Sequence, residues 1–549
     1  MKPLCPFWVN KVDALDVDSP SALTLSDILY CNVQDQDEVW SHVLLASYMI
    51  DINWIFRVVP SLLHIKEELL IVSGEKGYAK KFASSSSVYA GMKNGRVKVV
   101  EPNLPIPFGV HHSKFALCVN AKGIRVAVFT ANLIPDDWTK KSQGIYVQDF
   151  PRIRYTSEKD MVNFLPGPSK DTRGCRFKNE LYKYLDHYNV LFSASDHGGI
   201  PNTLLDQFDF AEASVELIAS VPGYHRGPDA GSFGLGKIKK ILQSMNFVPH
   251  QNNQPPILTW QFSSQGKLTD SFLTAFEDAM ITEATTENQL KQSRPVVQVV
   301  YPTENEVKDS IEGWCGGLSL PLQLHCCHPC INERLHKWGQ LAKNSCSTGT
   351  SRSRVLPHLK TYMRLTERKD GLKWFMLTSA NLSRAAWGEW QKNGTQLAIR
   401  SYELGVVYDS SSFMKLSEKG LFTTTPSKPV PFPSFIEGDG LVEVYIEGGK
   451  NKEIQEGPAL FLTYDPLNPD PYASTIQMRE RGADFKNHPL SSHDIPWVVD
   501  IPHFGRDALG KEIHEAIGGD DTHDRVVDDN SDRKKTKTAA HWRKRDRQK

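Results

Sequence analysis

The chain has 549 residues, and its 64 basic side chains balance its 64 acidic ones, which gives a formal net charge of +0 at pH 7. This length allows two sizeable domains, and a balanced charge offers no general attraction for nucleic acid, so any basic groove must be local. Nine cysteines, scattered and odd in number, without an N-terminal signal peptide, indicate reduced thiols in the cytosol or nucleus. No apolar run approaches the roughly 20 residues of a membrane helix, so no membrane association is expected.

Strand-like and helix-like segments alternate along the chain. The strand-like runs are 69–72, 125–129, 214–220, 296–301, 373–377, 396–400 and 442–446, and the helix-like runs are 177–187, 236–245 and 268–279. This alternation predicts an α/β fold in which each domain has a mixed β-sheet flanked by helices.

Breaks in this pattern predict the domain boundaries. Glycines and a proline interrupt it between 195 and 210, which gives an N-terminal domain at 1–205 and a C-terminal domain at 206–510. The tail at 511–549 is first acidic and then basic, a composition typical of disorder. Its basic run is also compatible with a nuclear localisation signal or a non-specific DNA tether. The segments 84–87 and 426–433 are expected to be loops.

One unit occurs twice in the chain. Each copy has a His-x-Lys triplet, an apolar strand, an Asn-Leu pair and a Trp: His112, Lys114, Asn132, Leu133 and Trp138 in the first copy, and His358, Lys360, Asn381, Leu382 and Trp387 in the second. Cleavage of a phosphodiester needs one group that attacks phosphorus and another that protonates the leaving oxygen. Each copy therefore supplies half of a phosphoryl-transfer site.

The residue types suit this chemistry. Alternation along a strand puts the His and the Lys of a triplet on one face, and the Asn at the end of the neighbouring strand can reach the same place. Imidazole can attack or donate a proton near neutral pH, while Lys and Asn can hold the phosphate oxygens through the transition state. No metal or other cofactor is then required. A third triplet, at His64, lies in a run (62–70) that is expected to be an exposed surface helix.

The double unit resembles the phospholipase D superfamily, and specifically its tyrosyl-DNA phosphodiesterase branch. Superfamily members usually carry an Asp five residues after each Lys, where this chain has Val119 and Leu365, a departure that matches this branch. The likeness runs from about Phe7 to about Pro502, and it includes the stretches 107–109, 132–138, 143–145, 357–364, 378–388 and 393–406. It implies two related phospholipase D-like domains with one active site at their interface.

The resemblance also implies roles for individual residues. His112 matches the nucleophile that attacks a 3′-phosphate and expels a tyrosine phenol, and His358 matches the acid that later activates water. Lys114, Asn132, Lys360 and Asn381 match the phosphate clamp. Gln143 and Glu403 match the groups that hold the two histidines. Because a carboxylate best orients a nucleophilic imidazole, Glu403 is assigned to His112 and Gln143 to His358, and His111 is taken as structural.

Contacts with DNA are suggested at five further residues. Ser263 and Ser264 resemble serines of the family that contact the bound strand, and Trp497 resembles a tryptophan near its site. Phe108 precedes the nucleophile and could line a groove, and Ser383 could touch phosphate. For each there is a structural alternative, because aromatic residues are often core residues and serines often form turns or cap helices.

The cysteines and histidines between 315 and 346 suggest a competing site. Cys327-x-x-Cys330 has the spacing of zinc ligands, but a second well-spaced pair is missing. This segment is therefore expected to be a variable loop rather than a zinc site.

The sequence as a whole favours a monomeric nuclear repair phosphodiesterase. Its expected substrate is DNA with a 3′-linked tyrosyl peptide, on single- or double-stranded ends. Two alternatives stay open: a superfamily enzyme acting on lipid or unmodified nucleic acid, and an inactive relative that binds DNA ends.

Overall fold

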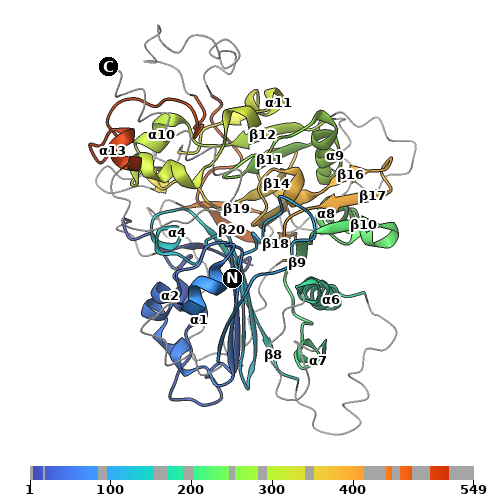
Figure 1. The fold of residues 1–549 in the computed structure, drawn as a ribbon. Coiled ribbons are helices and arrows are strands. Elements are labelled where there is room, and N and C mark those ends of the chain that lie inside the picture. Colours follow the sequence, from blue (N-terminus) through green and yellow to red (C-terminus); the bar gives the residue numbers. More distant parts are fainter. Residues whose placement is uncertain are drawn as a thin grey trace.

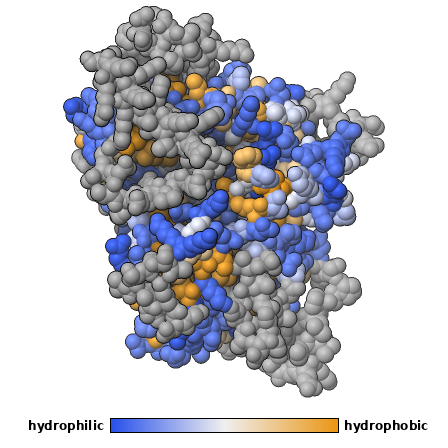
Figure 2. All heavy atoms as spheres, in the orientation of Figure 1, coloured by the Kyte–Doolittle hydropathy of each residue, from blue (hydrophilic) through white to orange (hydrophobic). Residues whose placement is uncertain are grey.

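Two large mixed sheets organise the molecule, one built from the first 151 residues and one from residues 216–408 (Figure 1). The structure is a computed structural model that describes residues 4–15, 19–84, 96–153, 171–188, 202–245, 254–281, 294–339, 352–412, 441–447, 458–472 and 495–518. None of the helices in these ranges is long and apolar enough to span a bilayer. On the face in Figure 2, hydrophilic residues cover most of the coloured surface and hydrophobic ones form separate patches.

The first sheet has eight strands in the order β2-β1-β8-β7-β6-β3-β4-β5. The strands are β1 (Phe7–Asn10), β2 (Ala22–Leu23), β3 (His42–Ser47), β4 (Glu68–Ser73), β5 (Val97–Val100), β6 (Phe115–Val119), β7 (Gly123–Phe129) and β8 (Gly144–Pro151). Short helices accompany them: α1 (Leu25–Leu29), α2 (Ile52–Val58), η1 (Pro60–His64), α3 (Tyr78–Ser84) and α4 (Pro135–Thr139).

The second sheet has seven strands in the order β13-β12-β11-β14-β15-β18-β9. The strands are β9 (Glu216–Ser220), β11 (Ile257–Gln261), β12 (Val296–Val300), β13 (Leu335–His336), β14 (Thr361–Leu365), β15 (Leu372–Thr378) and β18 (Glu403–Tyr408). Around it lie α6 (Arg173–His187), α7 (Asn202–Leu205), η3 (Gly227–Gly231), α8 (Gly234–Ser244), α9 (Asp270–Ile281), α10 (Glu304–Lys308), η5 (Gly313–Ser319), η6 (Leu324–Cys326), α11 (Pro329–Asn332), η8 (Arg352–Arg354), α12 (Arg384–Trp387) and α13 (Ile513–Gly518).

Two smaller sheets complete the described fold. One is β10-β17-β16, formed by β10 (Gly223–Arg226), β16 (Glu389–Gln391) and β17 (Gln396–Ile399). The other pairs β19 (Val442–Tyr445) with β20 (Ala459–Leu462).

The two large sheets repeat one topology. In the first sheet β4 and β3 are parallel, and β3, β6, β7 and β8 follow as antiparallel neighbours. In the second sheet β12 and β11 are parallel, and β11, β14, β15 and β18 follow in the same way. The repeated sequence unit occupies equivalent places in the two sheets, because each His-x-Lys triplet precedes the first strand of the central hairpin and each Asn follows the second.

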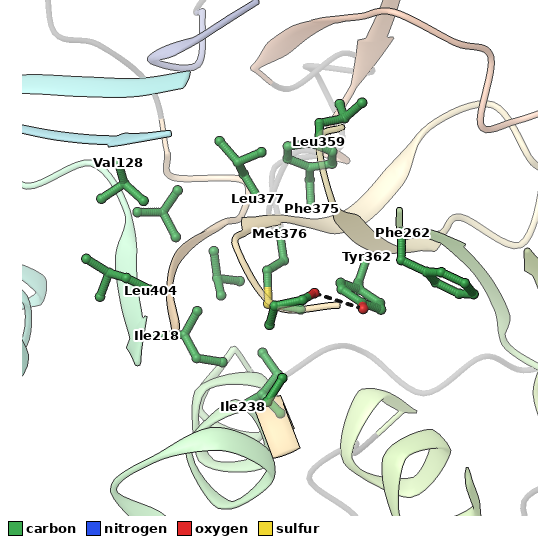
Figure 3. Packing of buried hydrophobic residues seen from close by; sticks show 14 of the residues in the cluster. Val128, Ile218, Ile238, Phe262, Leu359, Tyr362, Phe375, Met376, Leu377 and Leu404 are labelled. Atoms are coloured by element: carbon green, nitrogen blue, oxygen red, sulfur yellow. Dashed lines mark hydrogen bonds between the residues drawn. The ribbon is translucent and has the colours of Figure 1, made fainter. Parts of the chain in front are cut away.

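The central strands are buried on both faces, which explains why they read as continuous apolar runs. Every residue of β6, β7 and β18 is buried. One hydrophobic cluster contains residues of both sheets, and Figure 3 shows Val128 of β7 in the same cluster as Leu377 of β15 and Leu404 of β18. A second cluster fills the far side of the first sheet. The sheets therefore pack against each other, and α6 packs on the same inner face of the first sheet, where Phe177 meets Phe150.

Close contact between the sheets constrains one position in β8. A Cβ atom on Gly144 would lie 2.5 Å from Leu377 Cδ1, so a larger residue there would force the two sheets apart or displace the Leu377 side chain. Across the same interface, the rings of Phe7 and Phe375 meet edge to face with centroids 5.3 Å apart. Nearby, the hydroxyl of Tyr362 donates to the carbonyl of Ala380 at 3.1 Å (Figure 3).

The strands and helices expected from the sequence are present, with shifts of a few residues at their ends. The exception is 62–70, where the expected surface helix is wrong: a 3-10 helix ends at His64 and β4 begins at Glu68. His64 is exposed, as expected. Within the tail expected at 511–549, Ile513–Gly518 forms helix α13, and residues 519–549 lie outside the described residues. Residues 189–201, 85–87 and 426–433 lie outside the described residues, so the domain boundary and these two loops stay predictions.

Candidate active site

The two His-x-Lys triplets lie in extended segments just before β6 and β14, rather than within the strands. Each segment pairs with the other half of the chain. The backbone N–H of His112 donates to Tyr402 O at 3.0 Å, and that of His358 donates to Ser142 O at 2.9 Å. The backbone of each half-site is thus hydrogen-bonded to a residue of the other half.

The side chain of His112 is held by the second half. Its Nδ1 lies 3.0 Å from Glu403 Oε2, which also accepts from the hydroxyl of Ser379. Burial alone would raise the pKa of Glu403, but the neighbouring His112 and Lys114 hold it below its ordinary value. A carboxylate at Nδ1 keeps the proton on that nitrogen, so the lone pair of Nε2 is available for attack.

The side chain of His358 is held by the first half. Its Nδ1 lies 3.3 Å from Gln143 Nε2 and 3.3 Å from Asp137 Oδ2. Gln143 is oriented by the hydroxyl of Thr130, which donates to Gln143 Oε1 at 2.7 Å. The two pairings expected for Glu403 and Gln143 are therefore present as contacts.

Asp137 is the residue that the sequence argument missed. Its Oδ2 accepts from the backbone N–H of Asn132 at 2.7 Å and from Asn132 Nδ2 at 2.9 Å, in addition to its contact with His358. Burial raises the pKa of Asp137, while Lys141 and the Asn132 N–H act against that rise. The available signal was its place in the first turn of α4, immediately after the Asn-Leu pair, where an acidic residue can turn back toward the preceding loop.

Each lysine and each asparagine of the two units is held by contacts within its own half. Lys114 Nζ donates to His112 O at 2.6 Å, and Lys360 Nζ donates to His358 O. Asn381 Oδ1 accepts from two backbone N–H groups at 3.1 Å, and Asn132 Oδ1 lies 3.4 Å from Met49 N. An amide nitrogen carries two hydrogens, and Asn132 Nδ2 uses one of them on Asp137, so both asparagines can still donate to a bound anion.

Mutual electrostatic effects show that the half-sites share one environment. Burial and then Lys114 lower the pKa of His112, against the opposing effect of Glu403, and Lys360 of the other half lowers it too. Burial lowers the pKa of His358 well below its ordinary value, with Lys360, Lys114 and His112 adding to the effect. Burial also lowers the pKa of Lys114 to about 8. An anion bound among these groups would relieve their repulsion, so the arrangement suits a phosphate.

Sequence comparison places the chain in a family. The model of the family described as tyrosyl-DNA phosphodiesterase matches residues 3–473. Tyrosyl-DNA phosphodiesterase 1 of Arabidopsis thaliana is 32% identical over 520 residues, which is 92% of this chain and 76% of the relative. The chain belongs to the tyrosyl-DNA phosphodiesterase family.

Further relatives of the family agree. A probable tyrosyl-DNA phosphodiesterase of Caenorhabditis elegans is 30% identical over 379 residues, covering 67% of this chain and 76% of the relative. The crystal structure of the yeast tyrosyl-DNA phosphodiesterase matches with a TM-score of 0.54 and 20% identity, over 74% of this chain and 89% of the yeast chain. The predicted α/β fold, with two halves that each contain a mixed sheet and helices, is thereby confirmed.

In this family member, three of the five residues expected to contact DNA lie at the second half-site. The backbone N–H groups of Ser263 and Ser264 both donate to Asn381 Oδ1. Ser263 Oγ is buried and has no hydrogen-bond partner among the described residues. Ser383 caps α12, because its side chain accepts from Ala386 N at 3.1 Å.

The two expected aromatic contacts differ sharply in exposure. Phe108 is 80% exposed and has a φ of 64°, an unusual backbone angle for a bulky residue. Trp497 is fully buried, donates from Nε1 to Gly317 O at 3.0 Å and stacks on His503. Trp497 therefore has no exposed surface that could contact DNA, and it is a core residue.

His111 lies beside His112 but faces the core. It is fully buried, its Nε2 is 2.6 Å from Tyr188 Oη, and burial lowers its pKa to about 3. It is therefore neutral.

Among the described residues, one group of potential metal ligands occurs, formed by Asp270, His328 and Cys330. It shares no residue with the candidate active site.

Proposed function

We propose that the protein hydrolyses the phosphodiester between a DNA 3′ end and a tyrosine side chain, leaving a 3′-phosphate. Family membership supports the substrate class. The observation that carries the proposal is the reciprocal arrangement of the histidines, in which each imidazole is oriented by a side chain of the other half. Trapped topoisomerase I peptide and other 3′ adducts are the expected leaving groups.

In the first step His112 Nε2 attacks phosphorus and the bond to the phenol oxygen breaks. The phenol oxygen takes the electron pair of that bond and a proton from His358, while phosphorus becomes bonded to His112. The negative charge of the bound phosphate offsets the neighbouring lysines and favours the protonated form of His358 for this step. Glu403, at 3.0 Å from Nδ1, stabilises the positive charge that the ring of His112 then carries. A phenol, with a pKa of about 10, leaves more readily than an alcohol, so the acid has a light task.

In the second step the neutral His358 takes a proton from water as the water oxygen attacks phosphorus. The bond between phosphorus and His112 breaks, its electron pair returns to Nε2, and the DNA keeps a 3′-phosphate. The same group thus acts as acid and then as base, as microscopic reversibility of the two half-reactions requires. Asp137 and Gln143 keep His358 in place for both steps.

Four donors hold the phosphate through both steps: Lys114, Lys360, Asn132 and Asn381. They are buried or half-buried and pre-positioned, so little reorganisation is needed as negative charge develops on the oxygens. No step uses a metal ion or another cofactor.

The strand that bears the adduct would approach from the side of Ser263 and Ser264. Ser264 is half-buried, so its hydroxyl is the one that can donate to a phosphate, whereas Ser263 is only 1% exposed. Phe108 offers an exposed ring on which a base can stack, an interaction worth about 1–3 kcal/mol per base. A single chain holds all of the catalytic groups, so a monomer suffices for either single- or double-stranded ends.

A cleavage assay in EDTA separates the candidate functions. A 3′-phosphotyrosyl oligonucleotide should be converted to a 3′-phosphate, while the same oligonucleotide with a 3′-hydroxyl and a phospholipid substrate should not react. Cleavage of the lipid or of the unmodified strand alone would favour another superfamily activity. Binding without turnover would favour an inactive relative that binds DNA ends.

We also propose that the protein acts in the nucleus, as its proposed DNA substrate requires. The basic run at 533–549, which lies outside the described residues, is the candidate signal. Fusion to a fluorescent protein tests this, because removal of 533–549 should shift fluorescence to the cytoplasm if that run directs import.

A further inference from the structure

Three potential metal ligands meet outside the candidate active site. The carboxylate of Asp270, a ring nitrogen of His328 and the sulfur of Cys330 all lie within 4.8 Å of one another. The distance between Asp270 Oδ1 and His328 Nε2 is 3.6 Å. We propose that these three side chains form a Zn²⁺ site, with water in the fourth position.

The three ligands come from two separate elements. Asp270 is the first residue of α9, His328 immediately precedes α11, and Cys330 lies within α11. Pro329 occupies the first position of α11, and its ring fixes the backbone between the two other ligands. His328 and Cys330 are partly exposed and Asp270 is exposed, so a metal ion can enter from solvent.

The donor set favours zinc over the other common cations. Zinc takes nitrogen, sulfur and oxygen ligands in a tetrahedral arrangement. Magnesium and calcium prefer oxygen ligands alone. Binding releases the thiol proton of Cys330, because the thiolate is the ligand.

This set differs from the pair that sequence spacing suggested. Cys327 points elsewhere, with its sulfur 3.7 Å from Gln323 O, and the sulfur of Cys326 lies 3.4 Å from His325 Nε2. The third ligand, Asp270, is distant in sequence, so spacing within 315–346 could not reveal it. The expectation of a simple variable loop is replaced by this proposal.

The zinc site would link α9 to α11, two helices close to the second half-site. Gln265 Nε2 donates to Cys326 O at 2.6 Å, and Gln265 pairs with Leu382, which follows Asn381. Ser263 and Ser264, a few residues before α9, hold Asn381. A metal ion that links α9 to α11 would therefore stabilise this loop without touching the reacting groups.

Metal binding by the full-length chain tests the proposal. After treatment with a chelator and dialysis against Zn²⁺, the chain should retain one zinc ion, and Co²⁺ should produce the thiolate charge-transfer band of a cysteine-ligated tetrahedral site. Loss of a supporting residue around a metal typically costs about 10–100-fold in affinity, so Cys330→Ser and His328→Ala should weaken zinc binding at least tenfold. Cys330→Ser should also remove the cobalt band.

Two variants make the outcome decisive. Cys326→Ser removes a nearby sulfur outside the set and should keep the affinity and the band. Asp270→Asn changes an exposed side chain that should not affect folding, and it should lower the affinity as well. Zinc should raise the unfolding temperature of the wild type and of Cys326→Ser, but not that of Cys330→Ser.

The proposal is wrong if Cys330→Ser and Asp270→Asn bind zinc as tightly as the wild type, or if the wild type retains none. Cleavage of the phosphotyrosyl oligonucleotide is measured on the same samples and should persist without metal. Failure of the zinc site thus leaves cleavage unchanged, and failure of the proposed reaction leaves zinc binding unchanged.

Discussion

At the scale of residues, the two histidines proposed to carry the reaction differ in what contacts Nδ1. A carboxylate of the other half faces His112, whereas an amide and a carboxylate together face His358. The first environment keeps a nucleophilic lone pair on Nε2. The second can accommodate both the protonated and the neutral ring, as a group that is acid and then base requires.

Replacement of each histidine should therefore block a different step of the reaction. His112→Ala should lower kcat by about 10³-fold or more, because the nucleophile is lost. His358→Gln should slow hydrolysis of the intermediate more than its formation, so a covalent enzyme–DNA species should accumulate. Denaturing gel electrophoresis with a labelled phosphotyrosyl oligonucleotide measures this species. Equal turnover by both variants and the wild type would contradict the assigned roles.

Asp137 should behave as a positioning residue. A carboxylate 3.3 Å from Nδ1 favours the charged form of His358, so Asp137→Asn should lower the pKa of that ring further. His358 would then lose its proton at a lower pH. The alkaline limb of the pH profile of kcat should therefore move to a lower pH. Asp136→Asn, on the same helix and exposed, is the matched control. An unmoved limb in Asp137→Asn would show that the contact is only structural.

Anion affinity should depend on the charge of Lys114. Burial lowers its pKa from 10.5 to about 8, so in the free enzyme the cation is complete well below pH 8 and is lost as the pH rises above 8. Sulfate keeps a constant charge over this range and serves as a probe of the phosphate position. Its inhibition constant should rise between pH 7 and 9.5, and a constant value would contradict the assignment of Lys114 to the clamp.

At the scale of elements, helix α6 supports the nucleophile segment from the core side. Tyr188 Oη lies 2.6 Å from His111 Nε2, and Tyr184 Oη donates to Ser113 Oγ at 2.5 Å. Both tyrosines are buried, and Tyr188 stacks on Tyr402, the residue before Glu403. One helix therefore fixes the residues on either side of His112 and the segment that carries its partner.

Loss of the hydroxyl of Tyr188, the residue that follows the last turn of α6, should cost stability. Tyr188→Phe removes the partner of the buried His111 Nε2 and also the contact with Tyr184 Oη at 2.5 Å, which costs about 1–3 kcal/mol of unfolding free energy. Tyr182→Phe makes the same change on the same helix, at a hydroxyl without a hydrogen bond among the described residues, and should cost much less. Urea unfolding measures both variants. Equal losses would show that the His111 contact contributes nothing specific.

Sequence alone revealed the repeated elements but few contacts between them. The order of strand, Asn-Leu pair and Trp located His112, Lys114 and Asn132 because these residues belong to one local hairpin, and the same holds for the second copy. The approach of Asp137 to His358 depends on how the two sheets pack. The burial of Trp497 and the meeting of Asp270 with Cys330 depend on packing as well, and no local pattern encodes such contacts.

At the scale of the whole molecule, two copies of one topology face each other and are joined by contacts between their side chains and backbones. Lys141 of the first half and Glu312 of the second form a buried ion pair at 2.5 Å. The segment before β1 joins β20, with Cys5 N donating to Ala459 O at 3.0 Å. Such contacts fix the distance between the half-sites, so neither half is expected to catalyse the reaction alone.

A crystal structure with orthovanadate bound would show whether the two half-sites hold one phosphoryl group. Vanadate adopts the five-coordinate geometry of a phosphoryl group in transit, so we expect one vanadate with His112 Nε2 at one apex and His358 facing the other. Lys114, Lys360 and the two asparagines should contact its equatorial oxygens. Vanadate bound to only one histidine, with the second imidazole turned to a different surface, would contradict the account.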